Sequence, residues 1–395
     1  MDATLKDNVL TIHLEGHIDS GNARAVEEEV FGEVSKHPNV ELAIDAARLS
    51  YISSAGLRIL MRLRRQAKRA LPVLDVSPEV YEILDVTGFT DLLDVRKRLR
   101  EVSVEGCELI GSGGFGKVYR TDPDTIVKVY NANMGLDMVQ HERDTAQKAF
   151  LAGVPTAISY DVVRCGDSYG VVYELLNAKT VAQIVDADRS RVGEMGQKSA
   201  ALLKELHTIE MPEGALPNRK AEFLDWLPNV APVLEADEVQ TIYTFIEELP
   251  DRTTFLHGDF NAKNVMVQED GEFILIDIGD AAVGHPVFDV ASLILPYVYL
   301  PKSPMPDEEK RRLLGFSLED APTMWATMCG AYFGASDAEQ IGRITQDTMP
   351  YAQLLASYHG TRRAGYDVDY MSRVSVVGIR ERLLPLLRSA KPLDW

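Results

Sequence analysis

The chain has 395 residues, of which 46% are hydrophobic and 26% are charged. Such a chain has enough apolar side chains for packed cores, which excludes a disordered or low-complexity protein, and its length favours two or three domains. Its 41 Lys and Arg stand against 60 Asp and Glu, a formal net charge of −19, so phosphate backbones and anionic lipid would be repelled. We therefore expect neither nucleic acid nor a membrane as a partner.

The cysteines and the apolar stretches indicate the compartment. Three cysteines lie far apart and form no C-x-x-C motif, which favours a reducing compartment over disulfides or structural zinc. The longest apolar stretch, residues 287–300, contains Asp289 and Pro296 and is too short to span a bilayer. The polar N-terminal residues do not resemble a signal peptide. These features predict a cytoplasmic protein.

Strands and helices alternate over the first hundred residues. Apolar residues alternate over residues 9–14, which predicts a strand, and residues 40–45 and 71–76 are two further apolar runs of strand length. Amphipathic helices are expected after each strand: from Asp19-Ser20 to about Lys36, from Ser53-Ser54, and from Pro78 to about Val86. We expect one of the two serines to cap the second helix through its hydroxyl. The alternation predicts an α/β domain over residues 1–103.

Three segments of this α/β unit carry a resemblance to a known family: GHID at 16–19, LSYISSAGLR at 49–58 and EILDVTGF at 82–89. On these segments, residues 3–100 resemble the STAS domain of bacterial anti-sigma-factor antagonists. The resemblance implies a regulatory partner protein of the anti-sigma type, and phosphorylation of Ser54 by a partner kinase, which breaks the complex. The family often has Asp where this chain has Ser53. A phosphate at a helix N-terminus would meet free N–H groups and add nearly two negative charges to a binding surface.

A glycine-rich turn opens the rest of the chain, residues 104–395. The spacing of Gly111, Gly113 and Gly116, followed by Val118, is G-x-G-x-x-G-x-V, and predicted strands flank it on both sides. Glycines let such a loop close over a nucleotide, with its backbone N–H groups directed at phosphate oxygens. This spacing predicts a nucleotide-binding loop.

Two charged residues follow the turn at positions that suit nucleotide binding. Lys128 lies on the next predicted strand, residues 125–130, where it can reach the α- and β-phosphates. Glu142 lies on a helix expected over about residues 140–152 and is the expected partner that holds the lysine in place. Together with the three glycines, these two side chains form the predicted nucleotide site.

Asp259 stands in a polar segment, HGDFNAKN at residues 257–264. Asn264 follows Asp259 by five residues, and Asp277 comes directly after an apolar strand predicted at 273–276. The side-chain oxygens of Asn264 and Asp277 suit Mg²⁺, which would bridge phosphate oxygens. Asp259 can accept the proton of an acceptor hydroxyl. The pattern predicts phosphoryl transfer from ATP with Mg²⁺.

In this order, these pieces resemble the protein-kinase-like fold and are most similar to the aminoglycoside and choline phosphotransferases. The resemblance implies a two-lobed α+β domain, with an N-lobe of about residues 104–177 and a mostly helical C-lobe of about residues 178–395. It also implies that His257 supports the catalytic loop. We expect Asp289, in the next helix, to hold that loop, and His207 to be a core histidine.

The interval after Asp277 indicates the kind of acceptor. Protein kinases need a long activation segment there to seat a peptide, but Asp289, already in the next predicted helix, follows by only twelve residues, and there is no A-P-E motif. The catalytic loop also reads H-G-D rather than H-R-D. We therefore expect a small-molecule hydroxyl acceptor of the aminoglycoside, choline or sugar type, and the acidic second part of the chain could attract a cationic one.

Two other functions stay open. The chain could be a signalling protein of the partner-switching type, in which the STAS domain binds a regulator and the kinase-like domain senses nucleotide. Alternatively, the kinase-like domain could phosphorylate Ser54 itself. ATP turnover in the absence of an acceptor would separate these functions from a small-molecule kinase.

Overall fold

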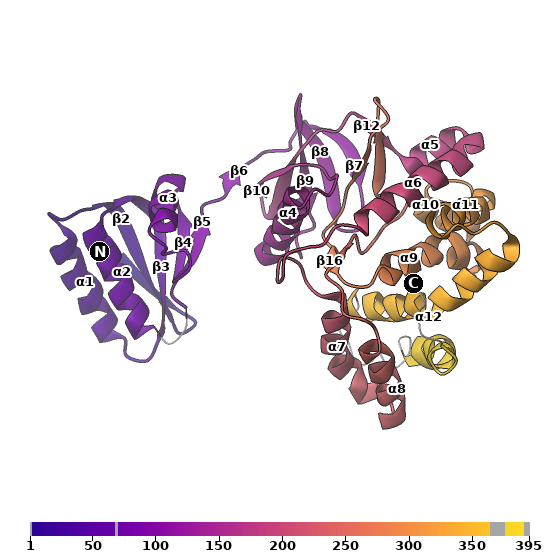
Figure 1. Ribbon diagram of the computed structural model, residues 1–395. Coiled ribbons are helices and arrows are strands. Elements are labelled where there is room, and N and C mark those ends of the chain that lie inside the picture. Colours follow the sequence, from indigo (N-terminus) through magenta and orange to yellow (C-terminus); the bar gives the residue numbers. More distant parts are fainter. Residues whose placement is uncertain (1, 68–69, 364–375, 391–395) are drawn as a thin grey trace. The chain divides into compact units, whose positions relative to one another are not determined.

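The computed structural model describes residues 2–67, 70–363 and 376–390 (Figure 1). The chain divides into two compact units, Met1–Ser103 and Val104–Trp395, called here the first and the second unit. Each unit buries a cluster of apolar side chains of its own. Within the described ranges, none of the helices combines the length and the apolar character that crossing a membrane requires.

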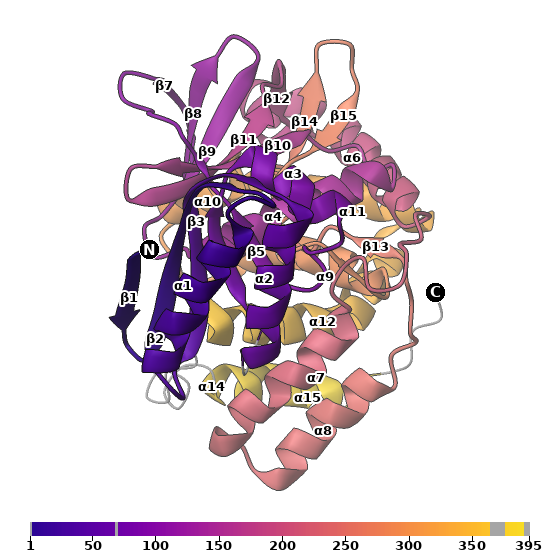
Figure 2. The ribbon, with the colours of Figure 1, turned by 90° about the vertical axis from the view of Figure 1, so that its left-hand side faces the viewer.

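The described residues of the first unit form a five-stranded sheet in the order β1-β2-β3-β4-β5 (Figure 2). β1 is antiparallel to β2, and the other neighbours are parallel. Helices α1 and α2 lie side by side against the sheet, and α3 packs against β3 and β5. The strands are β1 (Asp2–Lys6), β2 (Val9–Ile18), β3 (Glu41–Ile52), β4 (Pro72–Val76) and β5 (Asp94–Lys97); the helices are α1 (Ala23–Lys36), α2 (Ser54–Gln66) and α3 (Pro78–Val86).

The packing of α2 on the sheet depends on a close approach at Gly56. A Cβ atom at this position would lie 2.6 Å from a side-chain carbon of Ile52 and 2.8 Å from one of Ile18. No larger side chain fits there unless the helix moves away from the sheet. Leu60 and Leu63, one and two turns further on, are buried in the same core. The glycine in the Ser-Ser-Ala-Gly-Leu segment therefore sets how closely the helix start approaches the strands.

Two expectations for the first unit need correction. The sequence analysis did not predict the edge strands β1 and β5, because both are short and neither contains a buried residue: β1 alternates only Ala3 and Leu5 with polar residues, and β5 has four residues. The predicted hydroxyl cap on α2 is wrong: Ser53 is the residue before the helix, but its side chain makes no capping hydrogen bond, and its hydroxyl is buried without a partner. By contrast, the hydroxyl of Ser77 accepts a hydrogen bond from the backbone N–H of Val80 at the start of α3.

The second unit begins with a sheet whose strands run in the order β10-β11-β9-β8-β7, with each neighbouring pair antiparallel. Helix α4 packs against β10 and β11. The short strand β6 (Arg100–Glu101) precedes this part of the chain. Its elements are β7 (Glu108–Ser112), β8 (Gly116–Asp122), β9 (Thr125–Tyr130), α4 (Leu136–Leu151), β10 (Ser159–Cys165) and β11 (Ser168–Glu174).

The remainder of the second unit is mostly helical and carries two small antiparallel sheets, β12-β14-β15 and β13-β16. The helices are α5 (Val181–Ala187), α6 (Val192–Leu206), α7 (Arg219–Val230), α8 (Ala236–Glu247), α9 (Val287–Ile294), α10 (Asp307–Leu314), α11 (Ala321–Phe333), α12 (Ala338–Arg363), α14 (Val376–Gly378) and α15 (Leu384–Leu387). The strands are β12 (Ala178–Thr180), β13 (Phe255–Leu256), β14 (Val265–Gln268), β15 (Phe273–Leu275) and β16 (Ala282–Val283). The predicted fold class, an α/β unit followed by a two-lobed α+β unit, is confirmed.

Candidate active site

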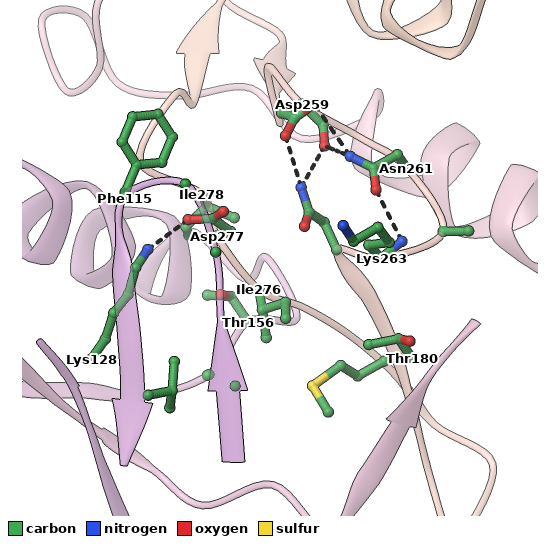
Figure 3. A pocket seen from close by; sticks show the side chains of 18 of the residues that line it. Phe115, Lys128, Thr156, Thr180, Asp259, Asn261, Lys263, Ile276, Asp277 and Ile278 are labelled. Atoms are coloured by element: carbon green, nitrogen blue, oxygen red, sulfur yellow. Dashed lines mark hydrogen bonds and ion pairs between the residues drawn. The ribbon is translucent and has the colours of Figure 1, made fainter. Parts of the chain in front are cut away.

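A cavity of about 1240 Å³ in the second unit is lined by both of its lobes (Figure 3). The sheet lobe contributes the glycine-rich turn, Lys128 and the end of β11. The helical lobe contributes the loop after β13, the residues after β15, and parts of α9, α10 and α12. All the residues that the sequence pattern assigned to the nucleotide, the metal and the base line this cavity. The exposed Ser54 belongs to the first unit and not to this site.

The glycine-rich turn joins β7 to β8, and its glycines have different surroundings. At Gly116 a Cβ atom would lie 2.1 Å from the backbone oxygen of Val129, so only glycine fits between the paired strands. At Gly113 a Cβ atom would meet no described atom within 4 Å. The N–H of Gly113 donates to the oxygen of Gly116 at 2.9 Å, which closes the turn. Gly116 is thus required by the sheet, whereas Gly113 leaves room for a ligand to approach the backbone.

Lys128 lies on β9 and its ammonium group contacts two carboxylates. Its Nζ is 2.6 Å from Oε1 of Glu142 on α4 and 2.7 Å from Oδ1 of Asp277 (Figure 3). Burial alone would lower the pKa of Lys128, but the charges of Glu142 and Asp277 outweigh burial and hold that pKa above its usual value. The lysine therefore stays cationic, and the structure brings together three residues from separate parts of the sequence.

Asp259 is held by the amides that follow it in the chain. Nδ2 of Asn264 donates to Oδ2 of Asp259 at 3.0 Å, and Nδ2 of Asn261 lies 3.2 Å from Oδ1 (Figure 3). The backbone N–H of Asp259 donates to Nδ1 of His257 at 3.2 Å, and the other nitrogen of that ring lies 3.3 Å from the oxygen of Ile276. His257 thus links the loop of Asp259 to the strand that leads to Asp277, in line with the supporting role that the sequence resemblance implies.

Asp289 on α9 is fully buried and holds the start of this loop. Its carboxylate accepts the backbone N–H groups of His257 at 2.7 Å and Gly258 at 2.8 Å, and it also contacts His207 at 3.3 Å. Burial alone would raise the pKa of Asp289, but its hydrogen bond to His207 and the charges of His207 and His257 lower it below its usual value. The other ring nitrogen of His207 contacts the hydroxyl of Tyr332 at 2.6 Å. The expected roles of Asp289 as a loop anchor and of His207 as a core histidine are confirmed.

Strand pairing places Asn264 beside the turn that carries Asp277. Val265 on β14 is opposite Leu275 on β15, and the N–H of Ile276 donates to the backbone oxygen of Asn264 at 3.0 Å. Asp277 then adopts a left-handed backbone with φ of 60°, a conformation that Asp and Asn tolerate better than most residues. Its side chain is 40% exposed. One end of a short hairpin therefore presents both predicted metal ligands.

These two residues fit Mg²⁺ by their donor chemistry. The amide nitrogen of Asn264 is used by Asp259, which leaves the amide oxygen for another partner. Asn264 and Asp277 would thus supply one amide and one carboxylate oxygen. Mg²⁺ is usually bound by one or two carboxylates together with waters and substrate phosphates, and not by a full cage of protein ligands. Among the described residues there is no group of three or more His, Cys, Asp or Glu side chains that could hold a metal ion.

Comparisons with known proteins identify both units. A model of the STAS domain matches residues 1–102, and a model described as the phosphotransferase enzyme family matches residues 107–327, which is more than half of the chain. The chain belongs to the phosphotransferase enzyme family. The recognition of a STAS domain joined to an aminoglycoside-phosphotransferase-like domain is therefore confirmed.

Individual proteins are similar to parts of this chain. The first unit is similar to BtrV of Bordetella bronchiseptica, described as an anti-sigma factor antagonist, with 33% identity over 92 residues, 22% of this chain and 78% of that protein. A gentamicin complex of APH(2'')-IIa is 18% identical with a TM-score of 0.47, over 72% of this chain and 94% of that one. Plasmodium vivax ethanolamine kinase is 13% identical with a TM-score of 0.46, over 72% and 82%. Similarity this low says nothing about the substrate of this phosphotransferase.

Two tyrosines beside Lys128, the buried Tyr130 and the partly buried Tyr173, escaped the sequence analysis. The Nζ of Lys128 lies 5.1 Å from the ring centre of Tyr130, and Tyr173 lies on the neighbouring strand and lines the cavity. Burial raises the pKa of both phenols above the usual value, so both stay neutral. Neutral, poorly hydrated surroundings strengthen the interaction of Lys128 with Glu142. The two-residue period of β9 could have revealed Tyr130, because it shares a face with Lys128.

The acid limb of the phosphotransferase's pH profile should move when Asp280 is changed. The carboxylate of Asp259 lines the cavity, and the loss of contact with bulk water raises its pKa. The charge of His257 lowers this pKa, whereas the negative charges of Asp277 and Asp280 raise it further. If the carboxylate of Asp259 is the active form, turnover falls as pH drops through that raised pKa. Asp280→Asn removes one negative charge and lowers the pKa of Asp259. The limb, measured from kcat between pH 4 and 8, should then lie at lower pH than in wild type. A limb that stays in place would contradict the role of Asp259.

Proposed function

We propose that this phosphotransferase transfers the γ-phosphoryl group of ATP, with Mg²⁺, to a hydroxyl group of a small molecule. The observation that carries the proposal is the convergence on one cavity of a cation held between two carboxylates, Lys128, and a carboxylate held by two amides, Asp259. Such a pairing suits a reaction that depends on positioning and charge neutralisation more than on covalent chemistry.

The nucleotide would lie between the glycine-rich turn and Lys128. The open space at Gly113 lets backbone N–H groups approach phosphate oxygens, and Lys128 would exchange its contact with Asp277 for the α- and β-phosphates while Glu142 keeps it in place. When bound, Mg²⁺ would be held by Asn264 and Asp277 and would neutralise charge on the phosphates. Nucleotide binding would thus free Oδ1 of Asp277 from Lys128 for the metal.

Asp259 would accept the proton of the acceptor hydroxyl. Its two carboxylate oxygens are oriented by Asn264 and Asn261, and its backbone is tied through His257 and Asp289 to the core. A residue fixed in this way would hold the hydroxyl oxygen in line with the transferred group, because the base and the nucleotide site line the same cavity. The raised pKa of Asp259 makes it a better proton acceptor than an ordinary aspartate, as long as it stays ionised.

Small hydroxyl compounds should be much better acceptors than peptides. Helix α9 begins at Val287, only ten residues after Asp277, which leaves no segment to hold an extended peptide beside Asp259. ADP release measured with Mg·ATP and a library of hydroxyl metabolites and aminoglycosides should find an acceptor whose kcat/KM exceeds that of a Ser/Thr peptide library by about a hundredfold or more. Saturable phosphorylation of the peptide library at a comparable kcat/KM would refute a small-molecule acceptor. No Mg-dependent release of ADP with any compound would refute the proposed function as a whole.

We also propose that the STAS domain binds a regulatory protein and that Ser54 is its control point. Ser54 is exposed on the first turn of α2, and the similarity to an anti-sigma factor antagonist supports a protein partner. Ser54→Asp places a negative charge there and should weaken retention of partner proteins from the cell of origin by about tenfold, while Ser54→Ala should keep it. Ser35→Asp, at an exposed serine on α1, is the matched control. If Ser54→Asp and Ser35→Asp retained partner proteins equally well, Ser54 would not be the control point of partner binding.

A further inference from the structure

On the helical side of Asp259 the cavity has an apolar wall. This acceptor wall is formed by Leu295, Pro296, Tyr297, Leu300, Leu313 and Leu355, from the end of α9 and the turn after it, from α10 and from α12. Tyr297 ties the wall to the catalytic loop, because its hydroxyl accepts the backbone N–H of Ala262 at 2.9 Å. An acceptor that reaches Asp259 from this side would therefore lie against aliphatic and aromatic surface, which favours a molecule with an apolar body.

The polar side chains around this wall already have partners inside the protein. Thr180 and Gln183 bond each other's backbone N–H groups in a capping box at the start of α5. The amide of Asn261 donates to Asp259 and accepts the backbone N–H of Lys263. Ser292 donates to the backbone oxygen of Asp289 at 2.7 Å. The oxygens of Thr180 and Gln183 are used in this way, and the donors that these two side chains still offer, a hydroxyl and an amide, are uncharged.

Lys263 differs from them. Lys263 is an exposed residue whose side chain lines the cavity close to Asn261 (Figure 3), and its methylene groups pack across Gly315, where a Cβ atom would lie 3.3 Å from Cγ. Among the described residues its ammonium group has neither an ion pair nor a hydrogen bond. The acids that line the cavity are Glu142, Glu174, Asp259 and Asp277. Glu142 and Asp277 contact Lys128, and Glu174 accepts the N–H of Ile158 at 2.7 Å.

We propose that the acceptor is a hydroxyl compound with an apolar body and an anionic group, and that Lys263 binds the anionic group. This inference rests on the proposed function. An anionic acceptor would be repelled by the phosphates of ATP, and a lysine beside the catalytic loop offsets that repulsion. Lys263 would repel a cationic group placed at the same point of the cavity. The inference therefore departs from the cationic acceptor that the acidic chain suggested.

Three probes share one hydroxyalkyl chain and differ in the charge of the other end: 10-hydroxydecanoic acid, its methyl ester and 10-aminodecan-1-ol. They distinguish an anionic, a neutral and a cationic acceptor. Their affinities for the full-length protein with Mg²⁺ and a non-hydrolysable ATP analogue are measured by calorimetry. The acid should bind wild type about tenfold more tightly than the ester, and the amine should bind most weakly. Lys263→Met should abolish the difference between acid and ester, and Lys263→Glu should reverse the order of acid and amine. Lys179→Glu, at an exposed lysine on β12 outside the cavity lining, should behave as wild type.

Several results would overturn the inference. Equal affinities for the three probes, a preference for the amine, or no binding of any probe would each contradict it. So would an acid preference that survives in Lys263→Met, or one that is lost equally in Lys179→Glu. Binding of the ATP analogue to wild type distinguishes a failure of the proposed function from a failure of the present inference. If wild type fails to bind the analogue with Mg²⁺, the proposed function fails; if it binds the analogue but prefers the amine, only the present inference fails.

Discussion

Replacement of Asp259 by Asn is expected to leave ATP binding intact and to lower turnover about a hundredfold or more, the usual effect of losing a general base. The substitution keeps the size and shape of the side chain. Asn264 and Asn261 would still surround it, but the new amide cannot take up the proton of an acceptor hydroxyl. Calorimetric titration with a non-hydrolysable ATP analogue reports binding, and ADP release with the best acceptor reports turnover.

The control for this experiment is a carboxylate that lies close in sequence but outside the cavity. Asp270 is exposed in the turn between β14 and β15, where it accepts the N–H of Glu272. Asp270→Asn removes the same charge and should change neither ATP affinity nor turnover. If Asp259→Asn retained wild-type turnover, Asp259 could not be the base. If it lost ATP affinity as well, its main effect would be on the architecture of the loop.

Replacement of Asp277 is expected to remove the dependence of ATP affinity on Mg²⁺. The carboxylate of Asp277 is the anionic ligand of the proposed metal site, and without it Asn264 alone remains. ATP affinity in the presence of Mg²⁺ should fall about tenfold or more in Asp277→Ala, the scale of one lost charge-assisted contact. In EDTA the variant and wild type should differ much less, because Lys128 keeps its contact with Glu142.

Two variants are needed here because of the backbone at Asp277. Its φ of 60° lies in the left-handed region, where Asn is tolerated but Ala is strained. Asp277→Asn keeps the backbone preference and removes only the charge. Loss of Mg-dependence in both variants would support the metal ligand. If Asp277→Asn kept full Mg-dependence while Asp277→Ala lost it, the effect of Ala would be one of backbone strain, and the assignment of the metal ligand would fail.

Local spacing in the sequence predicted much of the second unit. Asp259 and Asn264 are five residues apart, so a single loop places both, and the structure has them 3.0 Å apart through the amide and the carboxylate. The expectation that Asp289 holds this loop from the next helix is also confirmed, since its carboxylate accepts the N–H groups of His257 and Gly258. By contrast, helix α4 begins at Leu136, four residues earlier than expected; the residue before it is Gly135, which provides no side-chain cap to mark the helix start.

Local spacing was a poor guide where a neighbouring strand or helix decides the outcome. The serine cap on α2 failed because the hydroxyl of Ser53 is enclosed by the first unit rather than turned toward the N–H groups of its helix. The edge strands β1 and β5 depend on pairing with β2 and β4. The partner of β5 lies well back in the sequence, whereas β1 is joined to β2 by a tight turn in which Lys6 is opposite Val9. Strands of four or five residues are too short for their own pattern to identify them without the strand they pair with.

The sequence by itself determined the chemistry of this protein: the types of side chain, their order and their short-range spacing identified a STAS unit and a phosphotransferase unit. Only the tertiary structure decided which charges meet. Asp277 lies 2.7 Å from Lys128 although 149 residues separate them, and Lys263 remains without an ion pair among the described residues although the chain is strongly acidic. Charge–charge energies depend on distance and on exclusion of water, and both follow from strand order and helix packing, which no local pattern encodes.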